Sequence, residues 1–378
     1  MAAPFAPALS ALHLPLRIEL PGVTSVDLAP NPGITLRVLD PGLLQQRPGL
    51  DDLAAAYVDS RLEMDGSLLQ GVGLAARLGQ AIVRPQDRPH EDGFTCDSGL
   101  GASAERSLPT DFFRLWLDAE LVASCARFES GLESLAAAQL ASLRAICRKL
   151  RLQRGDRLLD ASCGWSALAR VAAREFGVQV LALAQSEAQL AVARARIRAE
   201  RLEHRVQVVL AAPGVLPSDR RFDRIVSIGL SGQANLPAFC RQLGSCLRPR
   251  GLFLGHFVTA RRSGPGVQRL AGATDFIRRH VFPSGAIPAF ADVRGALRHA
   301  DLDLLQAQNL RLHLARTLEC WSANLDRHLR QARHMVPERQ LRQWRLHLAG
   351  GAYAFRHGWL QMHELVAERP QDVAAGEH

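Results

Sequence analysis

The residues best suited to chemistry lie in one short segment near the middle of the chain, residues 157–170. Its apolar start predicts a buried strand, and its second half has the spacing of an amphipathic helix. The loop between them, from Asp160 to Trp165, has the layout of the first nucleotide-binding turn of an α/β sheet. Such loops usually need several glycines so that the backbone can approach a ligand, and this one keeps Gly164 alone. A second interpretation stays open, in which the segment is a structural turn and Trp165 packs against the helix.

The elements that must position this loop follow from the hydrophobic pattern. Five strands and three helices alternate along the chain, with strands at 157–161, 178–184, 206–210, 224–230 and 251–258 and helices at 165–176, 187–202 and 236–247. This alternation predicts the α/β class, a doubly wound, Rossmann-like and mainly parallel sheet. Further helices are expected at 111–118 and 130–150. After about residue 265 the pattern is mostly helical and rich in arginine, with one more strand near 303–312.

The N-terminal part has a different pattern. Residues 13–40 alternate apolar and polar side chains and are broken by Pro-Gly turns, which predicts a small antiparallel sheet. Residues 49–80 have helical periodicity. We therefore expect a small α/β domain at 10–80, a linker at 84–110 rich in Pro, Gly, Asp and Ser, a second domain at 111–368 and a polar tail at 369–378.

Composition limits the classes of protein. The chain has 378 residues, 47% hydrophobic and 22% charged, as expected of a soluble globular protein. Its net charge of +9 favours an anionic partner such as a membrane surface, although a generally basic protein is an equal interpretation. Lys149 is the only lysine. A nucleic-acid partner is disfavoured, because aromatic residues are few and no nucleic-acid motif is present.

Cysteine usage and hydropathy indicate the compartment. The seven cysteines form no CxxC pair, so neither a disulfide framework nor a metal site is predicted, and a reducing cytoplasm fits best. The first 16 residues have no basic region before their apolar run, which argues against a secretory signal. No apolar run reaches about 20 residues. We expect a cytoplasmic protein whose contact with membranes is peripheral.

Several motifs occur in a recognisable order. They are Asp111-Phe-Phe-Arg-Leu-Trp-Leu-Asp118, Ser124-Cys-Ala-Arg-Phe-Glu129, Leu159-Asp-Ala-Ser-Cys-Gly-Trp165, Phe222-Asp-Arg-Ile-Val-Ser-Ile-Gly229 and Gly251-Leu-Phe-Leu-Gly-His256. In this order the chain resembles the cyclopropane-fatty-acyl-phospholipid synthase family of S-adenosylmethionine (SAM)-dependent methyltransferases. Residues 55–66 are similar to the end of that family's small N-terminal lipid-associated domain.

The resemblance implies a reaction and a set of site residues. In that family the SAM methyl group is transferred to a cis double bond of a phospholipid acyl chain, a proton is lost with bound bicarbonate as the base, and a ring closes. SAM and bicarbonate are thus the implied cofactors, and acyl chains or an anionic membrane surface the implied partners. Cys125 and His256 match the catalytic anion site. The positions that match cofactor-binding residues are Asp160, Ser162, Cys163, Gly164, Trp165, Ser186 and Gln189.

Several positions of the implied pocket depart from the family pattern. Ser162 and Ser166 replace two glycines of the loop, and residues 211–214 offer no side chain that could accept a hydrogen bond from an adenine amine. The other departures are Ala123, Ala184, Gly232, Gln233 and Leu314. Ser186 and Gln189 also fit a plain capping box, and a buried cysteine such as Cys125 is more often a core residue.

Three hypotheses therefore stay open. The chain is an active SAM-dependent enzyme acting on unsaturated acyl chains, a methyltransferase-fold enzyme with a different acceptor, or a non-catalytic homologue. A non-catalytic homologue would be a lipid-binding or regulatory partner of an active synthase. Either a homodimer or a heteromer with an active family member is compatible with these hypotheses.

Overall fold

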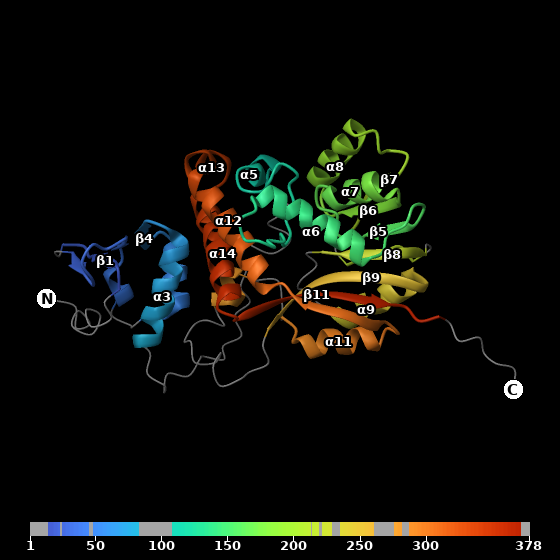
Figure 1. The fold of residues 1–378 in the computed structure, drawn as a ribbon. Coiled ribbons are helices and arrows are strands. Elements are labelled where there is room, and N and C mark those ends of the chain that lie inside the picture. The colour runs from blue at the N-terminus through green and yellow to red at the C-terminus, as the bar shows by residue number, and fades with distance from the viewer. Residues whose placement is uncertain are drawn as a thin grey trace, which may run out of the picture. The chain divides into compact units, whose positions relative to one another are not determined.

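The chain divides into two compact units, each of which is built from separated segments. The computed structural model describes residues 14–22, 25–44, 48–82, 108–212, 214–218, 221–228, 235–260, 276–281 and 287–371, except for the side chains of 78–82. Unit 1 contains Met1–Glu105, Arg262–Ser284 and Leu318–His357, and unit 2 contains Arg106–Arg261, Gly285–Thr317 and Gly358–His378 (Figure 1). The boundaries predicted from sequence place 111–368 in one domain, whereas two stretches of that range belong to unit 1.

Unit 1 begins with a four-stranded sheet. Its strands β1 (Leu16–Glu19), β2 (Val26–Asp27), β3 (Ile34–Val38) and β4 (Leu62–Asp65) lie in the order β2-β1-β3-β4. The predicted antiparallel arrangement is wrong for one pair, because β1 and β3 run parallel. After the hairpin to β2, the chain returns to the other edge of β1 in the same direction. The helical periodicity over 49–80 did not reveal β4, which separates α2 (Leu50–Val58) from α3 (Leu68–Ile82). A 3-10 helix, η1 (Pro41–Leu44), precedes α2.

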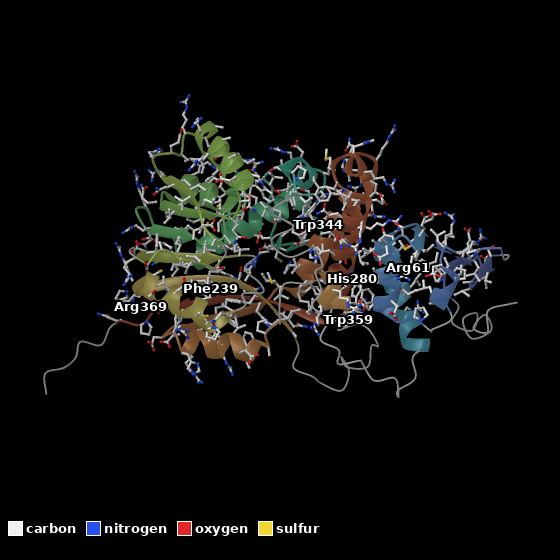
Figure 2. The ribbon with its side chains drawn as sticks, turned by 180° about the vertical axis from the view of Figure 1, so that it is seen from behind. Arg61, Phe239, His280, Trp344, Trp359 and Arg369 are labelled. Atoms are coloured by element: carbon white, nitrogen blue, oxygen red, sulfur yellow. The ribbon has the colours of Figure 1, made fainter. Side chains whose placement is uncertain are left out.

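The remaining elements of unit 1 are helical. They are η2 (Ile277–Val281), most of α12 (Arg311–Arg327), α13 (Leu329–Met335) and α14 (Glu338–Arg356). Arg345 of α14 donates a hydrogen bond of 2.6 Å to the Tyr57 hydroxyl, and the Arg342 guanidinium lies 5.2 Å from the centre of the Tyr57 ring. Figure 2 labels Arg61, His280 and Trp344 in this unit. Within the part of the chain that the structure describes, no helix has the length and apolar character needed to cross a bilayer.

Unit 2 is built on a seven-stranded sheet that confirms the predicted α/β class. The strands are β5 (Arg157–Asp160), β6 (Gln179–Ala184), β7 (Val206–Leu210), β8 (Phe222–Ser227), β9 (Leu247–Ala260), β10 (Asp303–Asn309) and β11 (Leu360–Glu368). Their order is β10-β11-β9-β8-β5-β6-β7. Strands β5 to β9 are parallel, and β11 runs antiparallel to both of its neighbours. The sequence analysis missed β11, which lies between β9 and β10.

Helices cover both faces of this sheet. The helices α6 (Leu135–Lys149), α7 (Ala167–Phe176) and α8 (Glu187–Ala199) contribute to one buried cluster, and α9 (Leu236–Cys246) and α11 (Phe290–Arg298) contribute to the other. The short helix α5 (Thr110–Arg114) precedes them. Figure 2 labels Phe239 of α9, one of the buried aromatic rings of the second cluster. Burying a side chain of this size contributes about 1.5–3 kcal/mol.

The alternation of side chains along β9 assigns His256 to one face. Leu252 and Leu254 belong to the cluster beneath α6, α7 and α8, whereas Phe253 and Phe257 belong to the opposite cluster. Successive side chains of a strand point to opposite faces. His256 therefore shares the face of Leu254, toward α6.

Candidate functional site

A hollow lies at the carboxyl end of β5, where ligands bind in open α/β sheets. It has an empty volume of about 440 Å³, part of it open to solvent. Five predicted cofactor-binding residues line it: Asp160, Ser162, Cys163, Gly164 and Trp165. Ala123 and Ser124 line the hollow as well. The loop after β5 thus brings together most of the predicted cofactor site.

Asp160 supplies a buried carboxyl group to this hollow. It is the last residue of β5 and is 2% exposed. Its Oδ1 accepts a hydrogen bond of 3.3 Å from the Ser162 amide, while Oδ2 has no partner among the described residues. Burial raises the pKa of Asp160 to about 7. Because an unpartnered buried carboxylate is unfavourable, this group is suited to a cationic or hydrogen-bond-donating ligand.

The two serines that replace loop glycines have different effects. Ser162 Oγ donates a hydrogen bond of 2.6 Å to the Ile228 carbonyl and accepts one of 2.9 Å from its amide, so it joins the ends of β5 and β8. Ser166 is buried with a φ of +70°, and its Oγ has no partner in the described part of the chain. A left-handed conformation costs a non-glycine residue about 1–2 kcal/mol. The loop therefore keeps its turn at the expense of local strain at Ser166.

Other predicted cofactor residues have structural roles in the described structure. Ser186 caps the N-terminus of α8, where its Oγ accepts a hydrogen bond of 3.2 Å from the Gln189 amide. Gln189 Oε1 accepts one of 3.0 Å from the Gln185 amide. Neither residue lines the hollow. Trp165 fits both of its interpretations, because it lines the hollow and its ring centre is 5.1 Å from that of Phe113.

A second set of polar side chains crosses the sheet on the face toward α6. Gln308 of β10, Glu364 of β11 and His256 of β9 stand opposite one another in the strand register. His256 Nε2 and Glu364 Oε2 are 3.0 Å apart, and the two side chains are 0% and 2% exposed. His256 Nδ1 is buried and has no hydrogen-bond partner among the residues described.

Two cations complete this set, which we call the Glu364 cluster: Arg127, Lys149, His256, Gln308 and Glu364. Lys149, the last residue of α6, forms an ion pair with Glu364 Oε1 and donates a hydrogen bond of 2.7 Å to Gln308. Arg127 Nη2 lies 3.2 Å from the same carboxylate oxygen. Burial opposes ionisation of Glu364, but the hydrogen bond and charge of His256, followed by those of Lys149, outweigh it and lower the pKa of Glu364 to about 2. Glu364 is therefore an anion at neutral pH.

The predicted catalytic residues Cys125 and His256 both belong to unit 2. Cys125 is buried, and its Sγ lies 3.4 Å from the Ala126 carbonyl. Burial and the nearby Glu364 charge raise the pKa of this thiol, so it is neutral. Leu314 is a buried apolar residue, and Gly232 and Gln233 lie outside the described residues.

The sequence analysis missed Glu364 and Arg127 as site residues and noted Lys149 only as the single lysine. Polar and apolar side chains alternate around Glu364 as they do in a strand with one face in solvent, so the sequence pattern is that of an exposed glutamate. The scarcity of lysine was the one sequence signal that could have drawn attention to this cluster.

The open, mainly parallel sheet and the hollow at the end of β5 define a Rossmann-like methyltransferase domain. Residues 103–365 match the family model of mycolic acid cyclopropane synthetase. The chain belongs to this family of SAM-dependent methyltransferases, as its sequence motifs predict.

Individual relatives agree with this assignment. The chain is 38% identical to a probable fatty acid methyltransferase of Pseudomonas putida, over all of this chain and 97% of that protein. It is 32% identical to cyclopropane mycolic acid synthase 1 of Mycobacterium tuberculosis, over 70% of this chain and 96% of the relative. The solved structure of mycolic acid cyclopropane synthase CmaA1, complexed with SAH and CTAB, matches with a TM-score of 0.65 and 30% identity, over 70% of this chain and 95% of that one.

Proposed function

We propose that this protein is a SAM-dependent methyltransferase that acts on unsaturated fatty acyl chains of membrane phospholipids. One observation carries the proposal: the buried Asp160 carboxyl faces the hollow with an oxygen that has no partner among the described residues. Similarity over the whole chain to a probable fatty acid methyltransferase supports the acyl substrate.

The residues of the hollow suit the amino-acid part of SAM better than its adenine. Asp160 would hold the α-ammonium group, and Gly164, where the space around a Cβ position is open, leaves room for the ligand beside the loop. On the adenine side, Ala211 and Ala212 have no polar side-chain atoms, so the base would have to be recognised by backbone groups and apolar contacts. When bound, SAM supplies an electrophilic methyl group.

Within the same proposal, His256 holds the bicarbonate that accepts the proton leaving the methylated acyl chain, and the neutral thiol of Cys125 is the second residue of this anion site. His256 suits this role because Nδ1 is free of partners among the described residues. Bicarbonate, which the family resemblance implies, stays a prediction for this chain.

The membrane part of the proposal depends on basic helices. Residues 311–345 of α12, α13 and α14 are rich in arginine. The guanidinium groups of Arg327 and Arg330 are exposed and suit anionic headgroups, while the exposed Arg333 and Arg339 pair with Glu338 and Asp59. We propose peripheral contact with an anionic membrane surface on this basis.

The test combines ligand binding with an assay of the product. Calorimetry with SAM and with S-adenosylhomocysteine should give dissociation constants in the micromolar range, about −8 kcal/mol. Incubation with SAM and vesicles of unsaturated anionic phospholipids should then increase the mass of the acyl chains by one methylene. No binding up to millimolar SAM would overturn the proposal.

A second candidate is a non-catalytic homologue that binds lipid as the partner of an active synthase. The apolar residues Ala211 and Ala212 and the strained Ser166 favour it, since each weakens a SAM site. Vesicle binding in a flotation assay without SAM binding would support this candidate. Binding of SAM without any change in acyl mass would instead indicate a different methyl acceptor.

A further inference from the structure

Part of one face of the seven-stranded sheet is not covered by the helices that the structure describes. On the face of Phe253 and Phe257, α9 packs mainly on β9, and α11 packs on β9 and β10. The strands β5, β6 and β7 form the other edge of the sheet. A pocket with an empty volume of about 790 Å³, part of it open to solvent, lies at the amino ends of these three strands. Its size is in the range of small-molecule sites.

The strand register determines the floor of this pocket. Leu159 and Leu181 belong to the cluster on the α9 face, and side chains two residues apart on a strand share a face. Arg157 and Gln179 therefore point to the same face, where they stand directly opposite each other on β5 and β6. The Arg157 guanidinium lies 5.6 Å from the centre of the Phe222 ring at the start of β8. The pocket thus has an apolar floor with a cation held against an aromatic ring.

The Arg157 side chain has no carboxylate partner among the described residues. Its backbone amide donates a hydrogen bond of 2.8 Å to Asp223 Oδ2, but Asp223 Oδ1 is engaged by Arg248 at 2.6 Å. The guanidinium itself contacts the Phe222 ring. A planar guanidinium can donate two parallel hydrogen bonds to the oxygens of a phosphate group. The donors of Arg157 are therefore suited to an anion that enters the pocket.

Two more basic residues, His204 and Arg205, line the pocket from the segment before β7. Arg205 Nη1 donates a hydrogen bond of 2.7 Å to the Gly177 carbonyl, which fixes the guanidinium and leaves its other donors available. Glu203 is the one carboxylate among the lining residues, and its Oε1 lies 4.0 Å from Arg198 Nε. The charges of the lining residues therefore favour an anionic ligand.

We propose that this pocket, which we call the basic pocket, binds a phosphate group carried by a soluble small molecule or by a phospholipid headgroup. Arg157 and Arg205 donate the charged hydrogen bonds, and the amides of Gln179 and Gln207 add neutral ones. Of the described residues, none lines both this pocket and the hollow beside Asp160. Because β5 begins at Arg157 and ends at Asp160, the two sites lie at opposite ends of one strand. The ligand of the basic pocket therefore does not depend on the proposed function.

A solvated set of surface charges is the competing explanation, because any basic surface attracts anions without a defined position. Such attraction depends on the total charge, whereas a defined site depends on Arg157 in particular. Arg194 provides the matched control, since it is an exposed arginine of α8, a helix that packs on the opposite face of the same sheet. Arg157→Gln and Arg194→Gln remove the same charge from the protein, so only a defined site distinguishes them.

The probe is inorganic phosphate, titrated into the full chain without SAM at constant ionic strength and followed by phosphorus-31 NMR. Wild-type protein should bind phosphate saturably, in the millimolar range. Arg157→Gln should weaken this binding at least about tenfold, because it removes a hydrogen bond to a charged group. Arg194→Gln should change it by less than about twofold. Glu203→Gln should strengthen it by about twofold to fivefold, because it removes the one carboxylate of the lining.

Flotation with phosphatidylglycerol vesicles distinguishes the two sources of the phosphate group. If the source is a headgroup, Arg157→Gln should float less than Arg194→Gln, and if it is a soluble molecule, both variants should float equally. Phosphate binding that does not saturate, or equal losses of phosphate affinity in Arg157→Gln and Arg194→Gln, would overturn the inference. Urea denaturation checks that Arg157→Gln is folded. Glu203 is exposed, so the expected gain in Glu203→Gln tests the pocket even where Arg157→Gln is unstable.

Discussion

The hollow beside β5 and the Glu364 cluster lie in the same unit, but the buried carboxyl groups of Asp160 and Glu364 differ in their partners. In the hollow, Asp160 Oδ2 and Trp165 Nε1 have no partners among the described residues. In the cluster, both oxygens of Glu364 are engaged by His256, Lys149 and Arg127. Since buried polar groups are normally satisfied, the hollow has the properties of a site awaiting a ligand. In the cluster, the Glu364 carboxylate already has its hydrogen-bond partners within the protein.

The two carboxyl groups show the same difference in their titration. Burial without a counter-charge raises the pKa of Asp160 to about 7. Glu364 is also buried, yet its partners lower its pKa to about 2. The nature of the partner, and not burial alone, decides the charge of a buried carboxyl group.

The largest effect is expected for Glu364→Leu, which removes the anion from the cluster. Lys149 and Arg127 would be left without compensation, and we expect the free energy of unfolding to fall by about 3 kcal/mol. Urea denaturation measures it. Glu175→Leu, which breaks an exposed ion pair, should change the stability by less than about 1 kcal/mol. Equal losses of stability in Glu364→Leu and Glu175→Leu would show that the buried ion cluster contributes no more to stability than an exposed ion pair.

Ser162→Ala should have the next largest effect, because the hydroxyl satisfies both backbone groups of Ile228. Leaving these groups unpaired should lower the free energy of unfolding by about 2 kcal/mol. Ser245→Ala is the control, since Ser245 donates an exposed bond to the Gln242 carbonyl and otherwise only contacts Cys246 Sγ at 4.0 Å, and it should change stability by less than about 0.5 kcal/mol. A stability of Ser162→Ala equal to that of the control would show that this serine is dispensable for the turn.

Asp160→Asn tests the hollow. Without the carboxylate, SAM affinity measured by calorimetry should fall at least about tenfold, because a hydrogen bond to a charged group contributes roughly 1.5–3 kcal/mol. Ser166→Ala, which leaves Asp160 in place, serves as the comparison and should keep most of the affinity. Unchanged affinity in Asp160→Asn would contradict the proposed role of this carboxyl group.

The pH dependence of stability follows from the same residue. The pKa of Asp160 is about 7 in the folded protein and 3.8 in its ordinary state, so the folded protein binds more protons between these values. The unliganded protein should therefore lose stability as pH rises from about 4 to about 7. Asp160→Asn should flatten this decline in urea denaturation curves recorded across that range. A steeper loss of stability with rising pH in Asp160→Asn would show that ionisation of Asp160 stabilises the fold, which is the opposite of the expected effect.

Ser166→Gly should have the smallest effect, and it should be stabilising. Glycine adopts a φ of +70° without strain, and the change also removes a buried hydroxyl that has no partner among the described residues. We expect a gain of about 1 kcal/mol, read from the urea midpoint. Ser60, whose φ of +59° occurs on the exposed surface, provides the control Ser60→Gly with a smaller gain. A loss of stability in Ser166→Gly would mean that the serine is not strained.

Local patterns predicted most of unit 2. Strands β5 to β9 were found because each is an apolar run, and β5, β6 and β8 are each followed along the chain by a helix of ordinary length. The loop from Asp160 to Trp165 was found for the same reason. The parallel pairing of β1 and β3 could not be predicted, since it depends on the path of the connection and not on alternation.

The Glu364 cluster lay beyond local analysis. His256 and Glu364 are 108 residues apart, and Lys149 and Glu364 are 215 apart. No spacing rule joins residues at such distances. His256 was identified because its motif resembles that of the family. Its partner Glu364 lies on β11, which was not predicted because it directly follows the long helical segment that ends at Arg356.

The insertion of β11 between β9 and β10 has a consequence for how the protein is made. Synthesis on the ribosome yields Lys149 and His256 long before it yields Glu364, because all of α12, α13 and α14 come in between. Until β11 enters the sheet, two strands present open edges and the cations near α6 have no counter-ion. Such distant pairings form slowly. The nascent chain therefore completes the Glu364 cluster only when β11 has entered the sheet.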